Sequence, residues 1–345
     1  MMRKPFEIGG HFIAAGERKT IDISVGTFSN HMPSNIPVQI IHGRRDGPTL
    51  FVSAVVHGDE IIGVEIVRRL LGSHKLSHMK GTLLCVPVVN TFGFVSHSRY
   101  LPDRRDLNRC FPGAANGSLA GQLAHVFMKE IVERCDYGID LHSAATHRVN
   151  LPQIRFNSGS EEITELARVF GAPVALEAPL RENSLRDAAA KVGVNVLLYE
   201  SGEALRFDEY AVRVGVRGIL NVMGHIGMIA KSKKSQPARS IMSQKSKWVR
   251  SPMGGIFRGV KSIGDVVKKG DLLGFIADPF GNNEEEILSE LTGVIIGRTN
   301  LPIVNPGDAL FHIAIIKKTQ LAEEKLSSME EDVEADPLFD EDEII

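Results

Sequence analysis

The chain has 345 residues, of which 43% are hydrophobic and 24% are charged, and its net charge is −2. These values are ordinary for a globular protein, and so small a net charge gives no overall field that would favour nucleic acid. The charge is unevenly placed, because residues 319–345 hold eleven acidic side chains against Lys325. That composition predicts a solvated, poorly ordered acidic tail over residues 317–345.

Cysteine usage and the N-terminus favour a cytoplasmic protein. The three cysteines, Cys85, Cys110 and Cys135, are widely spaced and form no CxxC pair, so a disulfide framework is not expected. The N-terminal apolar run is only Phe12–Ala15, which is too short for the core of a signal peptide. No apolar run reaches the length that spans a bilayer. We therefore expect no membrane partner.

Strand and helix patterns alternate through the first two thirds of the chain. Period-two or continuous apolar runs predict strands, and apolar residues at helical spacing predict helices. The predicted strands are 20–25, 36–41, 50–56, 82–89, 137–141 and 194–199, and the predicted helices are 61–71, 119–135, 161–170, 184–192 and 207–222. This alternation predicts an α/β domain over residues 1–240 with a doubly wound, mostly parallel sheet.

The pattern changes near Lys231, where a charged segment with Pro237 predicts a linker near residues 231–247. This short run lacks aromatic residues, so it is typical of a solvated segment rather than a nucleic-acid patch. A glycine-rich unit then occurs twice, at Gly255–Ile276 and at Gly293–Ile313. The repeat predicts a small, two-fold all-β domain over residues 248–316.

Polar side chains follow three of the predicted strands. His57 and Glu60 come after the strand 50–56, His142 follows 137–141, and Glu200 follows 194–199. Carboxyl ends of parallel strands meet at one edge of a sheet, where ligands bind. Zinc accepts two His and one Glu together with an open water position. The structural alternatives are a helix-start carboxylate for Glu60 or Glu200 and a core histidine for His142.

The stretch from Asn90 to Gly117 has no clear periodicity, and long irregular segments of this kind are often functional. Its second half carries four arginines and an asparagine: Arg99, Arg104, Arg105, Asn108 and Arg109. Planar guanidinium forks suit the recognition of a carboxylate. The alternative is a surface ion-pair network with neighbouring aspartates.

The ordered set of short motifs resembles the succinylglutamate desuccinylase/aspartoacylase family, which belongs with the zinc carboxypeptidases. The matching pieces, over roughly residues 50–205, are His57-Gly58-Asp59-Glu60, Arg99, Asp106-Leu107-Asn108-Arg109, Asp140-Leu141-His142 and Glu200. The resemblance implies one Zn²⁺ per chain held by His57, Glu60 and His142. It also implies that Glu200 is the general base, that Arg99 stabilises the oxyanion, and that Asn108 and Arg109 bind a substrate carboxylate. Arg104 and Arg105 stay open as competitors of Arg99.

The function implied by the resemblance is hydrolysis of the amide bond of a small N-acylated amino acid that carries a carboxylate. The alternatives are a carboxypeptidase or amidase acting on short peptides, and a non-catalytic scaffold with a decayed site. The C-terminal repeat resembles the barrel-sandwich fold of biotinyl and lipoyl carrier domains. Its central interval, Ala277–Gly293, contains no Lys, so we expect a non-carrier module that packs on the catalytic domain, shapes access to the site or mediates assembly into a homo-oligomer.

Overall fold

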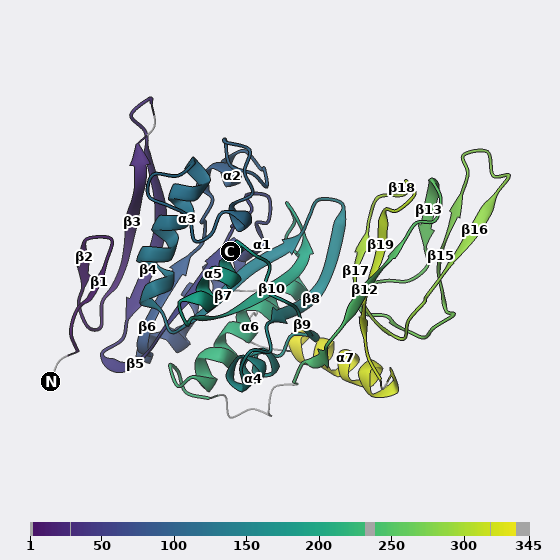
Figure 1. Ribbon diagram of the computed structural model, residues 1–345. Helices are drawn as coiled ribbons and strands as arrows, with labels where there is room; N and C mark the ends of the chain where they lie inside the picture. Colours follow the sequence, from purple (N-terminus) through teal and green to yellow (C-terminus); the bar gives the residue numbers. More distant parts are fainter. Residues whose placement is uncertain (1–2, 28, 232–238, 318, 336–345) are drawn as a thin grey trace.

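The computed structural model describes residues 3–27, 29–231, 239–317 and 319–335 (Figure 1). Its helices are α1 (Ile62–Gly72), α2 (Thr91–Val95), α3 (Leu119–Glu130), α4 (Glu161–Phe170), α5 (Leu185–Lys191), α6 (Glu209–His225) and α7 (Thr319–Glu334), with a short 3-10 turn η2 at Leu107–Arg109. The strands up to residue 243 are β1 (Phe6–Ile8), β2 (His11–Ile13), β3 (Arg18–Thr27), β4 (Pro33–His42), β5 (Arg45–Ala54), β6 (Lys80–Val86), β7 (Tyr137–Ala144), β8 (Arg148–Phe156), β9 (Val174–Glu177), β10 (Asn195–Glu203) and β11 (Ile241–Ser243). The later strands are β12 (Ser246–Arg250), β13 (Gly255–Gly259), β14 (Val266–Val267), β15 (Leu272–Ala277), β16 (Glu284–Leu288), β17 (Gly293–Thr299), β18 (Ile303–Val304) and β19 (Ala309–Ile315).

In the α/β part of the molecule the central sheet is mixed, with a majority of parallel strand pairings. Its middle strands, in the order β10-β7-β5-β6, are parallel. In the described part of the chain between β3 and β11, five pairings are parallel and three are antiparallel. The predicted arrangement therefore holds for the middle of the sheet. At the edges, β3 and β4 run antiparallel to their neighbours, and β8 runs antiparallel to β10 and β17 but parallel to β9.

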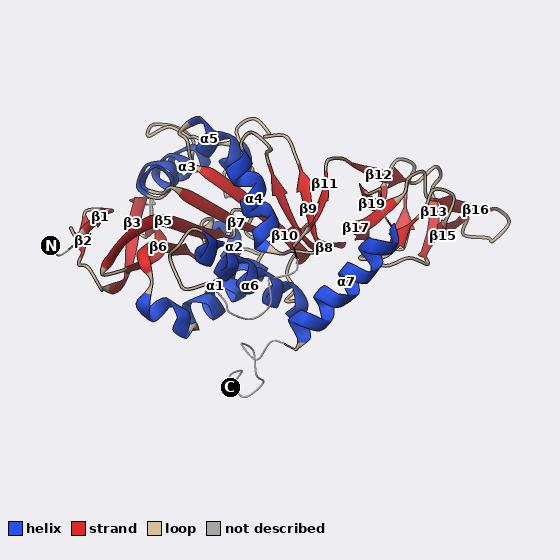
Figure 2. Cartoon of the chain, turned by 90° about the horizontal axis from the view of Figure 1, so that it is seen from below, coloured by secondary structure: helices blue, strands red, loops and turns tan. Residues whose placement is uncertain are grey.

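Helices cover both faces of this sheet, as expected of a doubly wound fold (Figure 2). One face packs against α1, α4 and α6, and the other packs against α3 and α5. The apolar stripe predicted for α1 is the buried one, because Ile62, Ile66 and Leu70 are fully inaccessible to solvent. Some helices begin at side-chain caps, such as Ser160 for α4 and Asp208 for α6, which satisfy free backbone N–H groups of the first turn.

The C-terminal module is a sandwich of two sheets around its own apolar core. Strands of the two repeat copies exchange partners, because β14 pairs with β17 and β18 pairs with β13. The module is not a separate sheet system, however. Strand β17 pairs with β8, so a single 13-stranded sheet runs through both predicted domains.

The predicted linker is partly a strand. Residues 232–238 lie outside the described residues, but Ile241–Ser243 forms β11, which pairs in parallel with β9. The chain therefore adds one more strand to the α/β layer before it enters the module at β12.

The prediction of a poorly ordered tail is wrong for residues 319–334, which form helix α7. Ala322, Met329 and Val333 of this helix are buried, and the helix lies along α6 and β14, beneath the seam between the two parts of the molecule (Figure 1). Burial of these spaced apolar residues holds the acidic helix in place. Residues 336–345 lie outside the described residues. None of the described helices is long and apolar enough to cross a membrane.

Candidate metal centre and active site

The turn after β5 delivers His57 and Glu60 to one point. Val55 has a φ of 59°, an unusual backbone conformation for a β-branched residue, and the chain changes direction there. Gly58 lies against α2, and a Cβ at Gly58 would be only 2.3 Å from the Cα of Gly93. Only glycine at position 58 allows this close approach of two backbones, so the tight turn depends on it.

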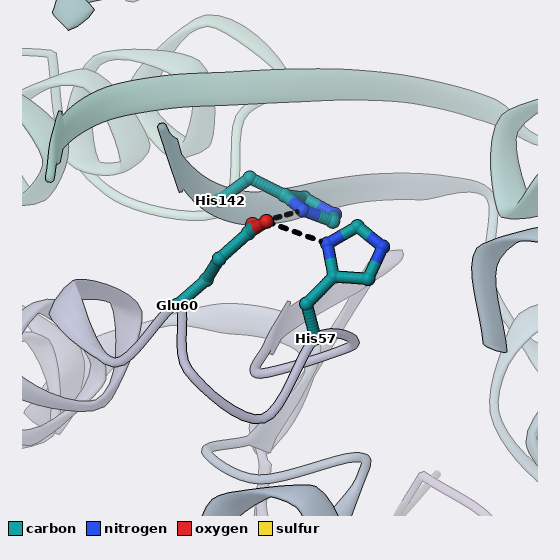
Figure 3. Close-up of side chains that lie close together, drawn as sticks. All are labelled: His57, Glu60 and His142. Carbon is teal, nitrogen blue, oxygen red and sulfur yellow. Dashed lines mark hydrogen bonds and ion pairs between the residues drawn. The ribbon is translucent and has the colours of Figure 1, made fainter. Parts of the chain in front are cut away.

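Glu60 lies between two histidine rings. The Nδ1 atom of His57 is 2.7 Å from one Glu60 carboxylate oxygen, and the Nδ1 atom of His142 is 2.6 Å from the other. Figure 3 shows His57 and Glu60 on the same turn and His142 arriving from strand β7. The ligand atoms of the three residues all lie within 4.8 Å of one another, so the sequence-predicted triad forms a compact, buried group.

Each histidine is oriented by a second carboxylate. His142 Nε2 donates to Asp140 over 2.8 Å, and Asp140 in turn accepts a hydrogen bond of 2.7 Å from Ser53. His57 Nε2 donates to Asp106 over 3.1 Å. A carboxylate only accepts, so each Nε2 carries a proton. Each Nδ1 faces Glu60 and is the nitrogen that would bind an ion in place of a proton. Carboxylates that fix ligand histidines in this way are typical of metal sites.

The pKa shifts of the site residues are those expected where a carboxylate lies beside positive charge. Burial by itself would raise the pKa of the Glu60 carboxyl, but His57 and His142 outweigh burial and hold that pKa well below its usual range. Burial opposes charge on His142, yet Asp140 and Glu60 outweigh it and raise the pKa of His142 well above its usual value. A buried carboxylate flanked by two imidazole nitrogens therefore fits the donor set of catalytic zinc.

Arg99 reaches the same group from the irregular loop. Its two Nη atoms lie 3.0 Å from Glu60 and 3.0 Å from Asp106. The Arg105 side chain instead lies 3.9 Å from Asp103. Arg99 and Arg109 line the cavity described below, whereas Arg104 and Arg105 do not.

Glu200 lies within strand β10 rather than at the start of a helix. It is in register with His142 of the neighbouring parallel strand β7, so both side chains occupy the same edge of the sheet. Asn150 donates a hydrogen bond of 3.0 Å to its carboxylate, and Arg155 lies 3.6 Å away. The Glu200 side chain keeps 14% of its surface exposed, as a group that exchanges protons with water requires.

These residues share one cavity of about 470 Å³. All seven predicted site residues line it: His57, Glu60, Arg99, Asn108, Arg109, His142 and Glu200. Asn108, in η2, also accepts a hydrogen bond of 2.9 Å from the backbone N–H of Leu185, which ties the loop to the start of α5. The exposed Arg109 follows it directly. The structure thus brings the predicted set together, and the roles of its members stay predictions.

Several residues that line the cavity were missed by the sequence analysis. They are Arg148, Asn150 and Arg155 on β8, Arg181 in the loop before α5, Arg186 in the first turn of α5, and Trp248 on β12. No sequence signal marks Trp248, because only tertiary packing brings the module to the cavity. Two of these arginines have a buried nitrogen without a hydrogen-bond partner among the described residues, Nη1 of Arg186 and Nε of Arg155. Burial and the nearby Arg155 lower the pKa of Arg186 to about 10.

The sequence matches one family model, described as the succinylglutamate desuccinylase/aspartoacylase catalytic domain, over residues 46–226. A curated relative is the N-alpha-acetyl-L-2,4-diaminobutyric acid deacetylase of Halomonas elongata. It is 28% identical over 297 residues, which cover 81% of this chain and 85% of the relative.

Solved structures share the fold over nearly the whole chain. A succinylglutamate desuccinylase/aspartoacylase from Rhodobacter sphaeroides superposes with a TM-score of 0.76 at 24% identity, covering 87% of this chain and 96% of that one. The product-bound ectoine utilization protein EutE (DoeB) from Ruegeria pomeroyi gives a TM-score of 0.78 at 22% identity, covering 91% and 99%. Coverage this high means that both matches include residues of the C-terminal module as well as of the α/β layer.

Proposed function

Because the chain belongs to the succinylglutamate desuccinylase/aspartoacylase family, we propose that it is a zinc-dependent deacylase. In this proposal it hydrolyses the amide bond of a small N-acylated amino acid and releases an acid and an amino compound. The observation that carries the proposal is the pair of His Nδ1 atoms that face the buried Glu60, with Glu200 in register beside His142.

His57, Glu60 and His142 would hold the zinc ion. Zinc bound by three protein ligands keeps an open position and lowers the pKa of water there to about 7. Glu200 would take a proton from the attacking water and deliver it to the leaving nitrogen. The carboxylate is partly exposed and is held by Asn150, so it can meet water without losing its orientation.

Arg99, Asn108 and Arg109 would bind the substrate. Arg99 is close enough to Glu60 to meet an oxyanion that develops beside the ion, and such preorganised charge stabilises the transition state. Asn108 and Arg109 lie side by side on η2 at the cavity wall. Their amide and guanidinium groups suit a carboxylate, which the fork of an arginine binds through both oxygens.

The charge of the cavity favours an acidic substrate. Six arginines line it against the three carboxylates of Glu60, Asp140 and Glu200; they are Arg99, Arg109, Arg148, Arg155, Arg181 and Arg186. The curated relative is named for diaminobutyrate, whose side chain carries an amino group. We propose that this chain instead prefers an N-acyl amino acid with a second carboxylate, which the excess of guanidinium groups would bind.

The test is a hydrolysis panel with the zinc-loaded protein and its Glu200→Gln variant, with free amine as the readout. The panel holds N-acetyl-L-aspartate, N-acetyl-L-glutamate, N-succinyl-L-glutamate, N-α-acetyl-L-2,4-diaminobutyrate, the primary amide of each acid, and a set of dipeptides. We expect the acids to be cleaved faster than their amides and the variant to lose about 10²–10⁴-fold in turnover while it keeps its zinc.

Four outcomes of the panel would contradict the proposal or one of its parts. Faster cleavage of dipeptides would favour a carboxypeptidase, and no cleavage of any member would favour a non-catalytic scaffold. Preference for the diaminobutyrate derivative over both dicarboxylates would refute the acidic-substrate part alone. A Glu200→Gln variant with turnover within threefold of the parent would show that another group is the base.

We also propose a cytoplasmic location and a C-terminal module without an attached cofactor. The module's interval between β15 and β17 holds acidic residues and Phe280 but no lysine. Intact mass spectrometry of protein from its native host should therefore show no biotinyl or lipoyl increment, and a mapped increment would refute this reading of the module.

A further inference from the structure

We infer that Asn150 positions the catalytic Glu200, and that strand β17 of the C-terminal module holds Asn150 in place. The inference rests on the proposed role of Glu200 as the base. It gives the module a part in catalysis, although Glu200 and the ligand triad all lie in the α/β layer.

The first observation concerns the contacts of Glu200. Among the described residues, Asn150 is the side chain that donates a hydrogen bond to Glu200, at 3.0 Å, and Arg155 is farther away at 3.6 Å. Both come from β8, the strand between β10 and the module. Asn150 keeps only 7% of its surface exposed, so its carboxamide is held by packing as well as by this bond.

The second observation is what lies on the other side of Asn150. Asn150 is in register with Gly202 of β10 on one flank and with Gly297 of β17 on the other. A Cβ at Gly297 would lie 2.8 Å from the Asn150 Oδ1 atom, which is closer than carbon and oxygen atoms approach without displacement. The bare backbone at Gly297 thus leaves the space that the carboxamide fills.

The chemistry of the amide fixes its orientation. A carboxylate only accepts hydrogen bonds, so the Asn150 NH₂ group must face Glu200 and its carbonyl oxygen must face β17. An uncharged donor can hold Glu200 without neutralising it, which a base requires. Aspartate at position 150 would instead place two carboxylates against each other, and alanine would leave Glu200 free to turn.

The first experiment measures kcat and KM of Asn150→Ala and Asn150→Asp on the panel substrate that the parent cleaves fastest. We expect kcat to fall about 10- to 100-fold in Asn150→Ala, the loss of one hydrogen bond to a charged group. KM should stay within about threefold and zinc content should be unchanged, because neither the ligands nor the carboxylate-binding residues are altered. A change in KM with kcat preserved would overturn the inference.

The second experiment tests the link to the module with Gly297→Ala. The added methyl group should displace Asn150 and lower kcat about tenfold or more in the parent background. In the Asn150→Ala background the same change should have little further effect, because the atom it displaces is gone; such non-additivity identifies a shared mechanism. Gly254→Ala is the matched control, since a Cβ there meets only ordinary contacts at 3.5 Å and beyond.

A crystal structure of Gly297→Ala supplies a readout independent of activity. We expect the Asn150–Glu200 distance to exceed hydrogen-bond range, with the ligand triad unmoved. Full additivity of the two substitutions, or an intact Asn150–Glu200 bond in an impaired Gly297→Ala protein, would overturn the inference. If Glu200→Gln is inactive while Asn150→Ala equals the parent, only this inference fails; if Glu200→Gln is active, the proposed function fails first.

Discussion

At the scale of single residues, the candidate site is built around the carboxylate of Glu60, which contacts two imidazoles and Arg99. The zinc prediction is tested directly at these contacts. We expect about one equivalent of zinc per chain in the parent and a loss of binding in His57→Ala, because two ligands do not complete the site. Metal analysis after dialysis measures this. Full zinc content in a His57→Ala/His142→Ala double variant would refute the assignment.

The carboxylate behind His142 should tune zinc affinity without binding the ion. Asp140 is buried and holds His142 Nε2 at 2.8 Å. Asp140→Asn should weaken zinc binding by about 10–100-fold, the usual effect of losing such a partner. Competition with a chromophoric chelator measures the change. Asp22→Asn, on the exposed side of β3, is the matched control, and equal affinities of the two variants would contradict the prediction.

Arg186 should lower the stability of the protein while it contributes to substrate binding. Its Nη1 atom is buried without a partner among the described residues, and Arg155 lies nearby. Removing a buried, poorly paired charge often stabilises a protein. Arg186→Met should therefore raise the melting temperature of the substrate-free protein by about 2 °C while raising KM for a dicarboxylate substrate. The exposed Arg206→Met should change neither quantity. A lower melting temperature would show that Arg186 is a structural residue.

At the scale of elements, the sequence pattern correctly predicted those features that depend on nearby residues, such as the ends of helices and strands. Helix α4 has the predicted bounds, because Ser160 caps its first turn and Gly171 ends it in the left-handed conformation. The strand-end residues His57, His142 and Glu200 meet at one edge because parallel strands align their carboxyl ends. The match to the family model confirms the resemblance that these motifs carry.

Strand β8 was missed for a physical reason. Its sequence contains Asn150, Pro152 and Gln153, which break both the apolar run and the period-two pattern. These residues lie in the sheet because tertiary pairing with β10 and β17 overrides local preference. Asn150 interrupts the pattern because it serves the site, and functional residues are where such pattern arguments are expected to fail.

Helix α7 was missed because the many acidic residues of this segment suggested a solvated tail, although its few apolar residues have helical spacing. Ala322, Met329 and Val333 are buried in contact with the rest of the molecule. We predict that Met329→Ala lowers the free energy of unfolding by about 2–4 kcal/mol, as for other buried methionines. Ser328→Ala, on the exposed side of the same helix, should have almost no effect. Chemical denaturation measures both, and equal values would show that α7 does not stabilise the protein.

At the scale of the whole molecule, the two predicted domains are joined by more than a linker. The pairing of β8 with β17 runs one sheet through both. One apolar cluster also includes residues of both parts: Leu151, Val174 and Leu176 from the α/β layer, and Val294, Ile296, Ala314 and Ile316 from the module. Trp248 of the module lines the cavity that holds the ligand triad. No local pattern in the sequence carries this information, because it depends on pairing between strands about 150 residues apart.

This shared core predicts a single cooperative unfolding transition for the whole chain. Separate domains unfold in separate steps, whereas a common sheet and core couple the two parts. Phe311 is fully buried in the module. Phe311→Ala should therefore lower the free energy of unfolding by about 3–5 kcal/mol and shift the single transition to a lower temperature. Phe280, which is 86% exposed, supplies the control, and Phe280→Ala should leave the transition in place. Differential scanning calorimetry would contradict the prediction if Phe311→Ala split the parent's transition into two, with the α/β layer unfolding at its original temperature.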